Sequence, residues 1–99
     1  MTIIWSDPAS DDMNDIYDFY LIKSPHTAAK IYNSIIQEAE ILKTHPKIAP
    51  PERLLEGEDL IFRSLVTKSG LFKIIYFIEE NDIFIYRIWC CRADVKRLK

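Results

Sequence analysis

Residues that could act as nucleophiles or metal ligands are few and scattered in this sequence of 99 residues. The two cysteines, Cys90 and Cys91, are adjacent, and neighbours on a strand point to opposite faces of a sheet. They therefore form neither a CxxC zinc half-site nor a link between distant segments. The two histidines, His26 and His45, lie far from both thiols in sequence. We expect no metal site, no cofactor and a packing role for the cysteines.

Positive charge is concentrated in the C-terminal part of the chain. Residues 1–59 carry 11 acidic and 5 basic side chains, whereas residues 60–99 carry 4 acidic and 8 basic ones. The net charge of −2 thus conceals an acidic half followed by a basic half. This asymmetry favours a local anion-binding or nucleic-acid-facing patch, with scattered solvated charge as the alternative. It argues against a uniformly basic protein that coats RNA or DNA.

Length and composition indicate one small globular domain spanning residues 1–99. The chain is 48% hydrophobic and 28% charged, which is the balance of an ordinary globular protein. No apolar run approaches the roughly 18–20 residues that a membrane span needs. The first residues lack the basic start and apolar centre of a secretory signal. We therefore expect a cytoplasmic protein that makes no membrane contact.

Two amphipathic helices are expected in the N-terminal half of the chain. Asp7 suits the N-cap of a helix at residues 8–22, and Ser24 suits that of a second helix at residues 25–44. Each cap is followed by a proline, which the first helical turn tolerates. Apolar residues recur every three or four positions in both helices. Because the connection is so short, the two helices should form an antiparallel hairpin.

Four segments have the β-branched and aromatic composition of strands, and they are residues 2–5, 60–67, 71–78 and 83–90. Short turns between the last three predict an antiparallel meander. Residues 46–59 are rich in proline and should be irregular, and residues 94–99 should form a helical turn or a tail. The predicted fold class is therefore α+β, in the order β-α-α-β-β-β. A helical hairpin should cover one face of a small, mainly antiparallel sheet.

The register of the last two strands stays open at this level. A four-residue turn pairs Ile78 with Ile83 and places Lys73 and Arg87 on opposite faces of the sheet. A three-residue turn pairs Glu79 with Ile83 and places the two cations on the same face. We expect a structural role for Arg87.

Several short segments, spread over nearly the whole chain, match one protein family in their order and spacing. They are Ile4-Trp5-Ser6-Asp7-Pro8, Ile16-Tyr17-Asp18-Phe19-Tyr20, Phe62-Arg63-Ser64-Leu65-Val66, Phe72-Lys73-Ile74-Ile75-Tyr76 and Ile88-Trp89-Cys90-Cys91-Arg92. The chain thereby resembles the RelE/ParE superfamily of toxins from bacterial type II toxin–antitoxin pairs, and it is closer to the ParE-like branch. The resemblance implies a helical hairpin on a small antiparallel sheet that includes the N-terminal strand, in agreement with the pattern above.

The resemblance implies one of two mechanisms. RelE-type members cut mRNA in the ribosomal A site, with Lys and Arg stabilising charge on the phosphate and Tyr, His or Glu moving protons. ParE-type members share the fold, usually lack those proton-transfer residues and poison DNA gyrase. For the ribonuclease mechanism, the resemblance points to Arg63, Lys73 and Arg92 as electrostatic stabilisers.

Proton transfer is the weak point of the ribonuclease interpretation. No His or Tyr follows Tyr86, so the reaction would depend on Tyr76, Tyr86, Glu56 or a thiol, none of which lies in a supporting motif. The pI of about 5.6 is also unfavourable, because phosphate contacts dominate affinity for nucleic acid. We therefore favour a ParE-like toxin that is not an enzyme.

Three hypotheses follow. The leading one is a growth-inhibiting toxin of a plasmid-stabilisation system, acting on a protein target such as DNA gyrase. The second is a ribosome-dependent mRNA endonuclease, and the third is an inactive family member that only binds partners. In each case the resemblance implies a cognate antitoxin, whose disordered segment would wrap around apolar grooves of the toxin. No direct DNA binding is expected, because operator DNA is usually bound by the antitoxin.

Overall fold

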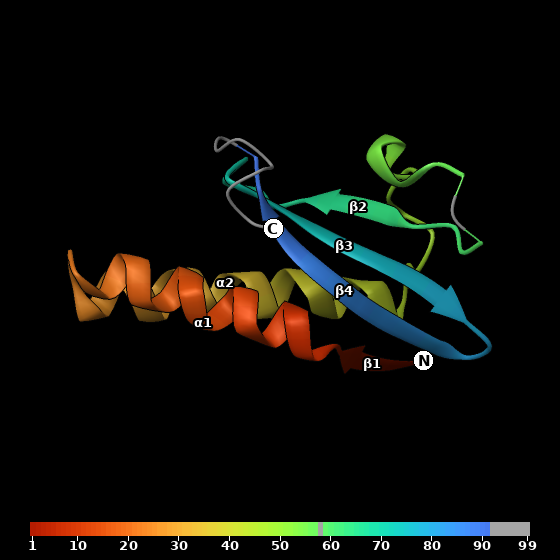
Figure 1. Ribbon diagram of the computed structural model, residues 1–99. Coiled ribbons are helices and arrows are strands. Elements are labelled where there is room, and N and C mark those ends of the chain that lie inside the picture. The colour runs from red at the N-terminus through yellow and green to blue at the C-terminus, as the bar shows by residue number, and fades with distance from the viewer. Residues whose placement is uncertain (58, 92–99) are drawn as a thin grey trace.

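The computed structural model describes residues 1–57 and 59–91, and it packs two helices against one face of a four-stranded sheet (Figure 1). In chain order the elements are β1 (Thr2–Trp5), α1 (Asp7–Leu21), α2 (Pro25–Glu40), η1 (Ile41–Lys43), η2 (Arg53–Leu55), β2 (Arg63–Val66), β3 (Phe72–Glu79) and β4 (Asp82–Cys90), where η marks a 3₁₀ turn. The predicted α+β class and element order are confirmed. Arg92 and residues 94–99, which were expected to form a helical turn or a tail, lie outside the described residues.

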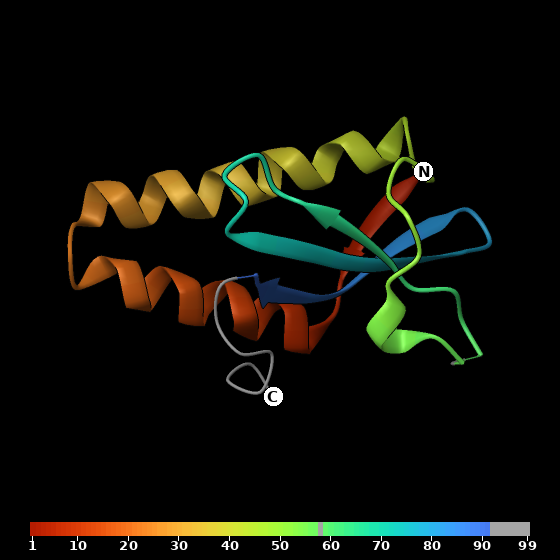
Figure 2. The same ribbon diagram turned by 90° about the horizontal axis from the view of Figure 1, so that it is seen from above.

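The strands are arranged in the order β1-β4-β3-β2. β1 runs parallel to β4, whereas the other two pairs are antiparallel. The first and last of the described strands are therefore neighbours, and the helical hairpin extends beyond the sheet at the turn between α1 and α2 (Figure 2). Neither α1 nor α2 has the length and apolarity of a membrane span, and these are the long helices of the part of the chain that the structure describes.

Serine side chains begin both helices. The hydroxyl of Ser6 accepts from the amide three residues later at 3.1 Å, and that of Ser24 does the same at 3.3 Å. The first cap is one residue earlier than expected, so that Asp7 is the first helical residue and not the cap. Ser6 is favoured because its hydroxyl also donates to the carbonyl of Tyr86 at 2.8 Å, which ties the start of α1 to β4.

The main core lies between the helices and the sheet, and a smaller cluster lies on the opposite face. The core contains Ala9, Met13, Ile16, Ile35, Ala39, Leu42, Ala49, Phe72, Ile74, Tyr76, Ile83, Ile85 and Ile88. The smaller cluster contains Phe62, Ile75 and Trp89, packed against Leu55, Leu60 and Phe77. Residues at the end of η2 and after it therefore cover part of the sheet face that the helices leave open.

A β-bulge determines the register that the sequence left open. Ile78 pairs with Ile83, as in the alternative that separates Lys73 from Arg87. Tyr86, however, has no residue opposite it on β3, and this extra residue shifts the alternation of the rest of β4. Lys73 and Arg87 consequently follow the same alternation, as in the other alternative. Neither turn alone predicts this combination.

Asp12 joins α1 to the edge of β4 just beyond the end of β1. Its side chain is buried, and its two carboxylate oxygens accept from Nε and Nη2 of Arg87 at 2.7 and 2.8 Å. The same carboxylate accepts the backbone N–H of Ile88 at 2.9 Å. Asp12 thus satisfies an edge amide that a neighbouring strand would otherwise bind. The hydrogen bonding of Arg87 to the Asp12 carboxylate raises the pKa of Arg87, so this guanidinium stays charged.

We predict that Asp12→Ala lowers the free energy of unfolding by about 2–4 kcal/mol, because it removes the carboxylate shared by a buried amide and a guanidinium. Asp15 is an exposed aspartate of the same helix. The control Asp15→Ala should therefore change the free energy by no more than about 0.5 kcal/mol. Urea unfolding followed by circular dichroism measures both values. Similar losses in the two variants would contradict the role given to Asp12.

Candidate functional site

The cations expected to stabilise a phosphate are not brought together. Arg63 lies opposite Tyr76 in the register of β2 and β3, which places it on the side of the sheet that faces the helices. Lys73 lies opposite Val66 and belongs to the other face. The third candidate, Arg92, lies outside the described residues. Arg63 and Lys73 therefore do not converge on one anion.

Arg63 instead binds the segment 46–62, which we call the strap. Its Nη1 donates to the carbonyl of Ala49 at 2.8 Å. Tyr76, its partner across the strands, donates its hydroxyl to the carbonyl of Pro46 at 2.7 Å. Two side chains on the helix side of the sheet therefore hold the first residues of the strap.

Lys73 holds the strap from the opposite face through Glu52, which is only 5% exposed. The Glu52 carboxylate accepts from Lys73 Nζ at 3.0 Å and from the amide of Leu54 at 2.9 Å. Burial acts to raise the pKa of Glu52, but the hydrogen bonds from Leu54, Lys73 and Ser64 and the charge of Lys73 outweigh it. The pKa of Glu52 is therefore lowered, and its ion pair with Lys73 persists at neutral pH.

Between these two anchors the strap crosses the edge of β2. The amide of Ser64 donates to the carbonyl of Pro50 at 3.1 Å, and the amide of Glu52 donates to that of Phe62 at 2.7 Å. These two hydrogen bonds pair the strap with Phe62 and Ser64, where a longer strand was expected. The predicted strand at 60–67 is accordingly shortened to β2, because its first residues belong to the strap.

The side chains considered for proton transfer lie apart from the cations or are engaged elsewhere. Tyr76 is fully buried, and burial raises the pKa of its hydroxyl, which already donates to a carbonyl. Tyr86 packs its ring 4.8 Å from that of Phe62, measured between centroids. Glu56 is exposed on the turn after η2. Partial burial raises the pKa of the Cys91 thiol, which leaves little thiolate at neutral pH.

Sequence reasoning missed two buried carboxylates that organise this region, Asp12 and Glu52. Asp12 shares the spacing of Ala9, Met13 and Ile16, so its position on the buried face of the helix was a usable signal. Glu52 lies in an irregular, proline-rich segment, where no periodicity indicates burial.

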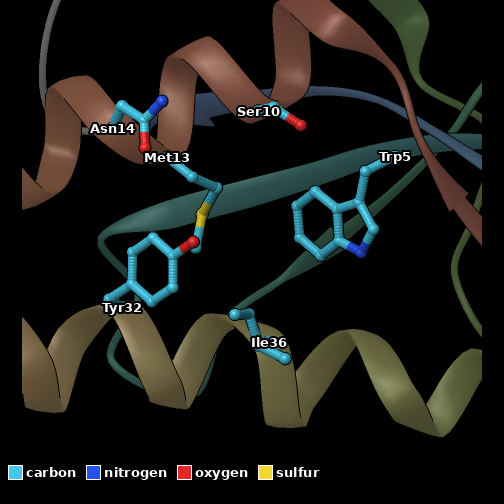
Figure 3. A pocket seen from close by; sticks show the side chains of 6 residues that line it. All are labelled: Trp5, Ser10, Met13, Asn14, Tyr32 and Ile36. Carbon is cyan, nitrogen blue, oxygen red and sulfur yellow. The ribbon is translucent and has the colours of Figure 1, made fainter.

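A groove of about 290 Å³ lies between α1 and α2 (Figure 3). It is lined by Trp5, Met13, Tyr32 and Ile36, with Ser10 and Asn14 on α1. The indole of Trp5 comes from β1 and lies between the two helices. A concave apolar surface of this size suits a large side chain of another protein. A second hollow of about 240 Å³ lies beside η2.

Comparison with known proteins agrees with this architecture. The profile of a family described as ParE toxin of type II toxin-antitoxin system, parDE, matches residues 3–95. Among solved structures, the chromosomal ParDE TA system from P. aeruginosa has a TM-score of 0.76 and 24% identity, covering 89% of this chain and 92% of that chain. At this identity the likeness bears on the fold alone. No curated protein matches the sequence at a significant level. The family resemblance drawn from the sequence is confirmed, including its ParE-like branch.

The lowered pKa of Glu52 predicts how its contribution to stability depends on pH. At neutral pH we expect Glu52→Gln to lower the free energy of unfolding by about 2 kcal/mol, because a charged hydrogen-bond acceptor is lost. A carboxyl whose pKa is lowered on folding stabilises the protein above its ordinary pKa, and this contribution disappears as pH falls to the lowered value. The difference between wild type and variant should therefore shrink below about pH 4.3.

Urea unfolding at several pH values measures this difference. The matched control is Glu56→Gln, which changes an exposed carboxylate in the same segment. It should have little effect at any pH. A difference between wild type and Glu52→Gln that stays constant down to pH 2 would contradict the lowered pKa.

Proposed function

Because this chain belongs to the ParE toxin family of type II toxin–antitoxin systems, we propose that it inhibits growth by binding a protein target such as DNA gyrase. Family membership implies a cognate antitoxin, and we propose that this antitoxin neutralises the toxin by direct binding. In this mechanism the toxin acts by contact and performs no chemistry on RNA.

The position of the cations carries this proposal. Arg63 and Lys73 lie on opposite faces of the sheet, and each binds an acceptor in the strap. Stabilising a phosphate in its transition state needs positive groups aimed at one point, with an acid and a base beside them. Lys73 and Arg63 serve instead to hold a loop, which supports a role by surface contact over cleavage.

A gyrase supercoiling assay tests the proposed target. Purified toxin added to gyrase, ATP and relaxed plasmid should reduce the supercoiled product in a dose-dependent way. Toxin mixed beforehand with its antitoxin should leave supercoiling intact. Unimpaired supercoiling at a toxin concentration that arrests growth would contradict gyrase as the target.

The competing ribonuclease mechanism is tested in a reconstituted bacterial translation reaction. We expect primer extension to find intact mRNA, with an mRNA-cleaving member of the family as positive control. Cleavage in phase with codons would replace the contact mechanism with the ribosome-dependent one, and its loss in Arg92→Ala would identify a stabilising cation.

The substitution Tyr76→Phe tests whether the buried hydroxyl of Tyr76 has a structural or a catalytic role. The variant should lose about 1 kcal/mol of stability, because the carbonyl of Pro46 loses a donor. It should inhibit growth as strongly as wild type when equal amounts of folded protein are present. A folded Tyr76→Phe that is inactive would instead favour proton transfer by this residue.

A further inference from the structure

We propose that residues 92–99, which lie outside the described residues, bind the outer flank of α1, the side of this helix that faces away from α2. Apolar side chains of segment 92–99 cover Phe19, and its cations lie beside the carboxylates of the same flank. The inference concerns the toxin alone and is independent of the proposed target and antitoxin. It is carried by an uncovered aromatic ring, by matched charge and by the place where the described chain leaves the sheet.

The outer flank of α1 and its C-cap consists of four exposed residues at spacings of three and four, namely Asp11, Asp15, Phe19 and Ile22. At about 100° per residue, all four lie within about 100° of Asp12, which reaches the edge of β4. Tyr17 lies about 140° from Asp12 in the opposite sense. Its ring packs 5.9 Å from that of Tyr32 on α2, measured between centroids. The outer flank therefore faces away from α2.

Two large apolar side chains of this flank are uncovered. Phe19 is 61% exposed and Ile22 is 87% exposed. Phe19 lies only about 20° from Asp12 around the helix axis, so it belongs to the side of α1 that meets the sheet. It is uncovered because the end of α1 extends beyond the sheet (Figure 2). A segment that covers the ring of Phe19 removes apolar surface from water.

The carboxylates of the flank are matched by the composition of segment 92–99. Among the described residues, Asp11 and Asp15 have no cation within ion-pairing distance. Segment 92–99 reads RADVKRLK, with four cations and one carboxylate. Val95 and Leu98 are three residues apart, the spacing that puts two side chains on one face of a helical turn. One face of the segment can therefore meet Phe19 while its cations meet the two aspartates.

The described chain leaves the sheet beside α1. Asp12 accepts the backbone N–H of Ile88 at 2.9 Å, and Cys91 follows only three residues later. The end of β4 lies at α1 in Figure 2. Eight extended residues span up to about 26 Å, whereas Asp11 and Phe19 are about 12 Å apart along the helix. Segment 92–99 therefore reaches the whole flank, and its attachment to the same chain gives it a high effective concentration there.

Charge and connectivity decide between possible occupants. The α1 of a second copy would bring the same carboxylates to the flank, and nucleic acid would bring phosphates, so both are repelled. A second copy could present its own segment 92–99, but the segment of the same chain is favoured by its attachment. The open face of the sheet is a poorer position for this segment, because Lys73 lies there and the carboxylate of Glu52 is already paired with it.

Backbone ¹⁵N relaxation of the purified toxin, measured by NMR at neutral pH and low salt, tests this contact. In wild type the amides of Val95 and Leu98 should have order parameters of about 0.8, close to those of rigid backbone. Phe19→Ser should lower both below about 0.6, the range of flexible backbone, because the apolar contact is lost. The double variant Asp11→Lys with Asp15→Lys should do the same, because attraction becomes repulsion. Thermal unfolding establishes that each variant remains folded.

Leu54→Ser is the matched control, because Leu54 is also 61% exposed but lies in η2 and not on α1. It should leave the order parameters of Val95 and Leu98 as they are in wild type. A loss of order as large as that in Phe19→Ser would place the segment against the strap and overturn the proposed position.

Three further outcomes would overturn the inference. Order parameters below about 0.6 in wild type would show that the segment binds no part of the toxin. Rigid amides that neither Phe19→Ser nor the double variant affects would place the segment elsewhere. Order that disappears on dilution, together with a dimer detected by sedimentation, would make a second copy the source of the bound segment. These measurements contain no gyrase and no antitoxin, so the proposed function stands or fails separately.

Discussion

The carboxylate of Asp12 fixes the position of the helical layer against the sheet. β1 is only four residues long and leaves the edge of β4 after Trp5. The amide of Ser6 then donates a hydrogen bond to the carbonyl of Ile85 at 3.0 Å, and α1 continues beside β4. The Asp12 carboxylate accepts the next amide on this edge, that of Ile88. A side chain of α1 thus satisfies a part of the β4 edge that β1 is too short to reach. The direction of α1, and with it the groove against α2, depends on this contact.

The bulge in β4 and the Asp12 ion pair belong to one arrangement. The extra residue, Tyr86, packs against Phe62, while the next residue, Arg87, reaches Asp12 at the strand edge. Without the bulge, the alternation of β4 would give Arg87 the opposite orientation. The single inserted residue thus gives Arg87 the alternation of Ile75 and Trp89, and its guanidinium meets Asp12 at the edge of β4 beyond the end of β1.

The helices and most of the strands could be predicted from the sequence, because the spacing of apolar residues and the capping residues are properties of short segments. Ser24 followed by proline placed the start of α2, and neighbouring acceptors at Ser6 and Asp7 left the start of α1 uncertain by one residue. The bulge had no such signal, since one unpaired residue changes neither composition nor period. The positions of Arg63 and Lys73 depend on strand register and on the strap. Their places in the family pattern alone suggested that the two cations share one site, whereas the fold puts them on opposite faces of the sheet.

The parallel pairing of β1 with β4 has a consequence for the synthesis of this toxin. Thr2 lies opposite Asp82, so β1 has β4 as its only sheet neighbour within the described residues, and β4 is made after the other three described strands. The α1 contacts through Ser6 and Asp12 likewise require β4. Contacts of such large sequence separation form late. A nascent chain therefore lacks the groove and the closed sheet until β4 has been made.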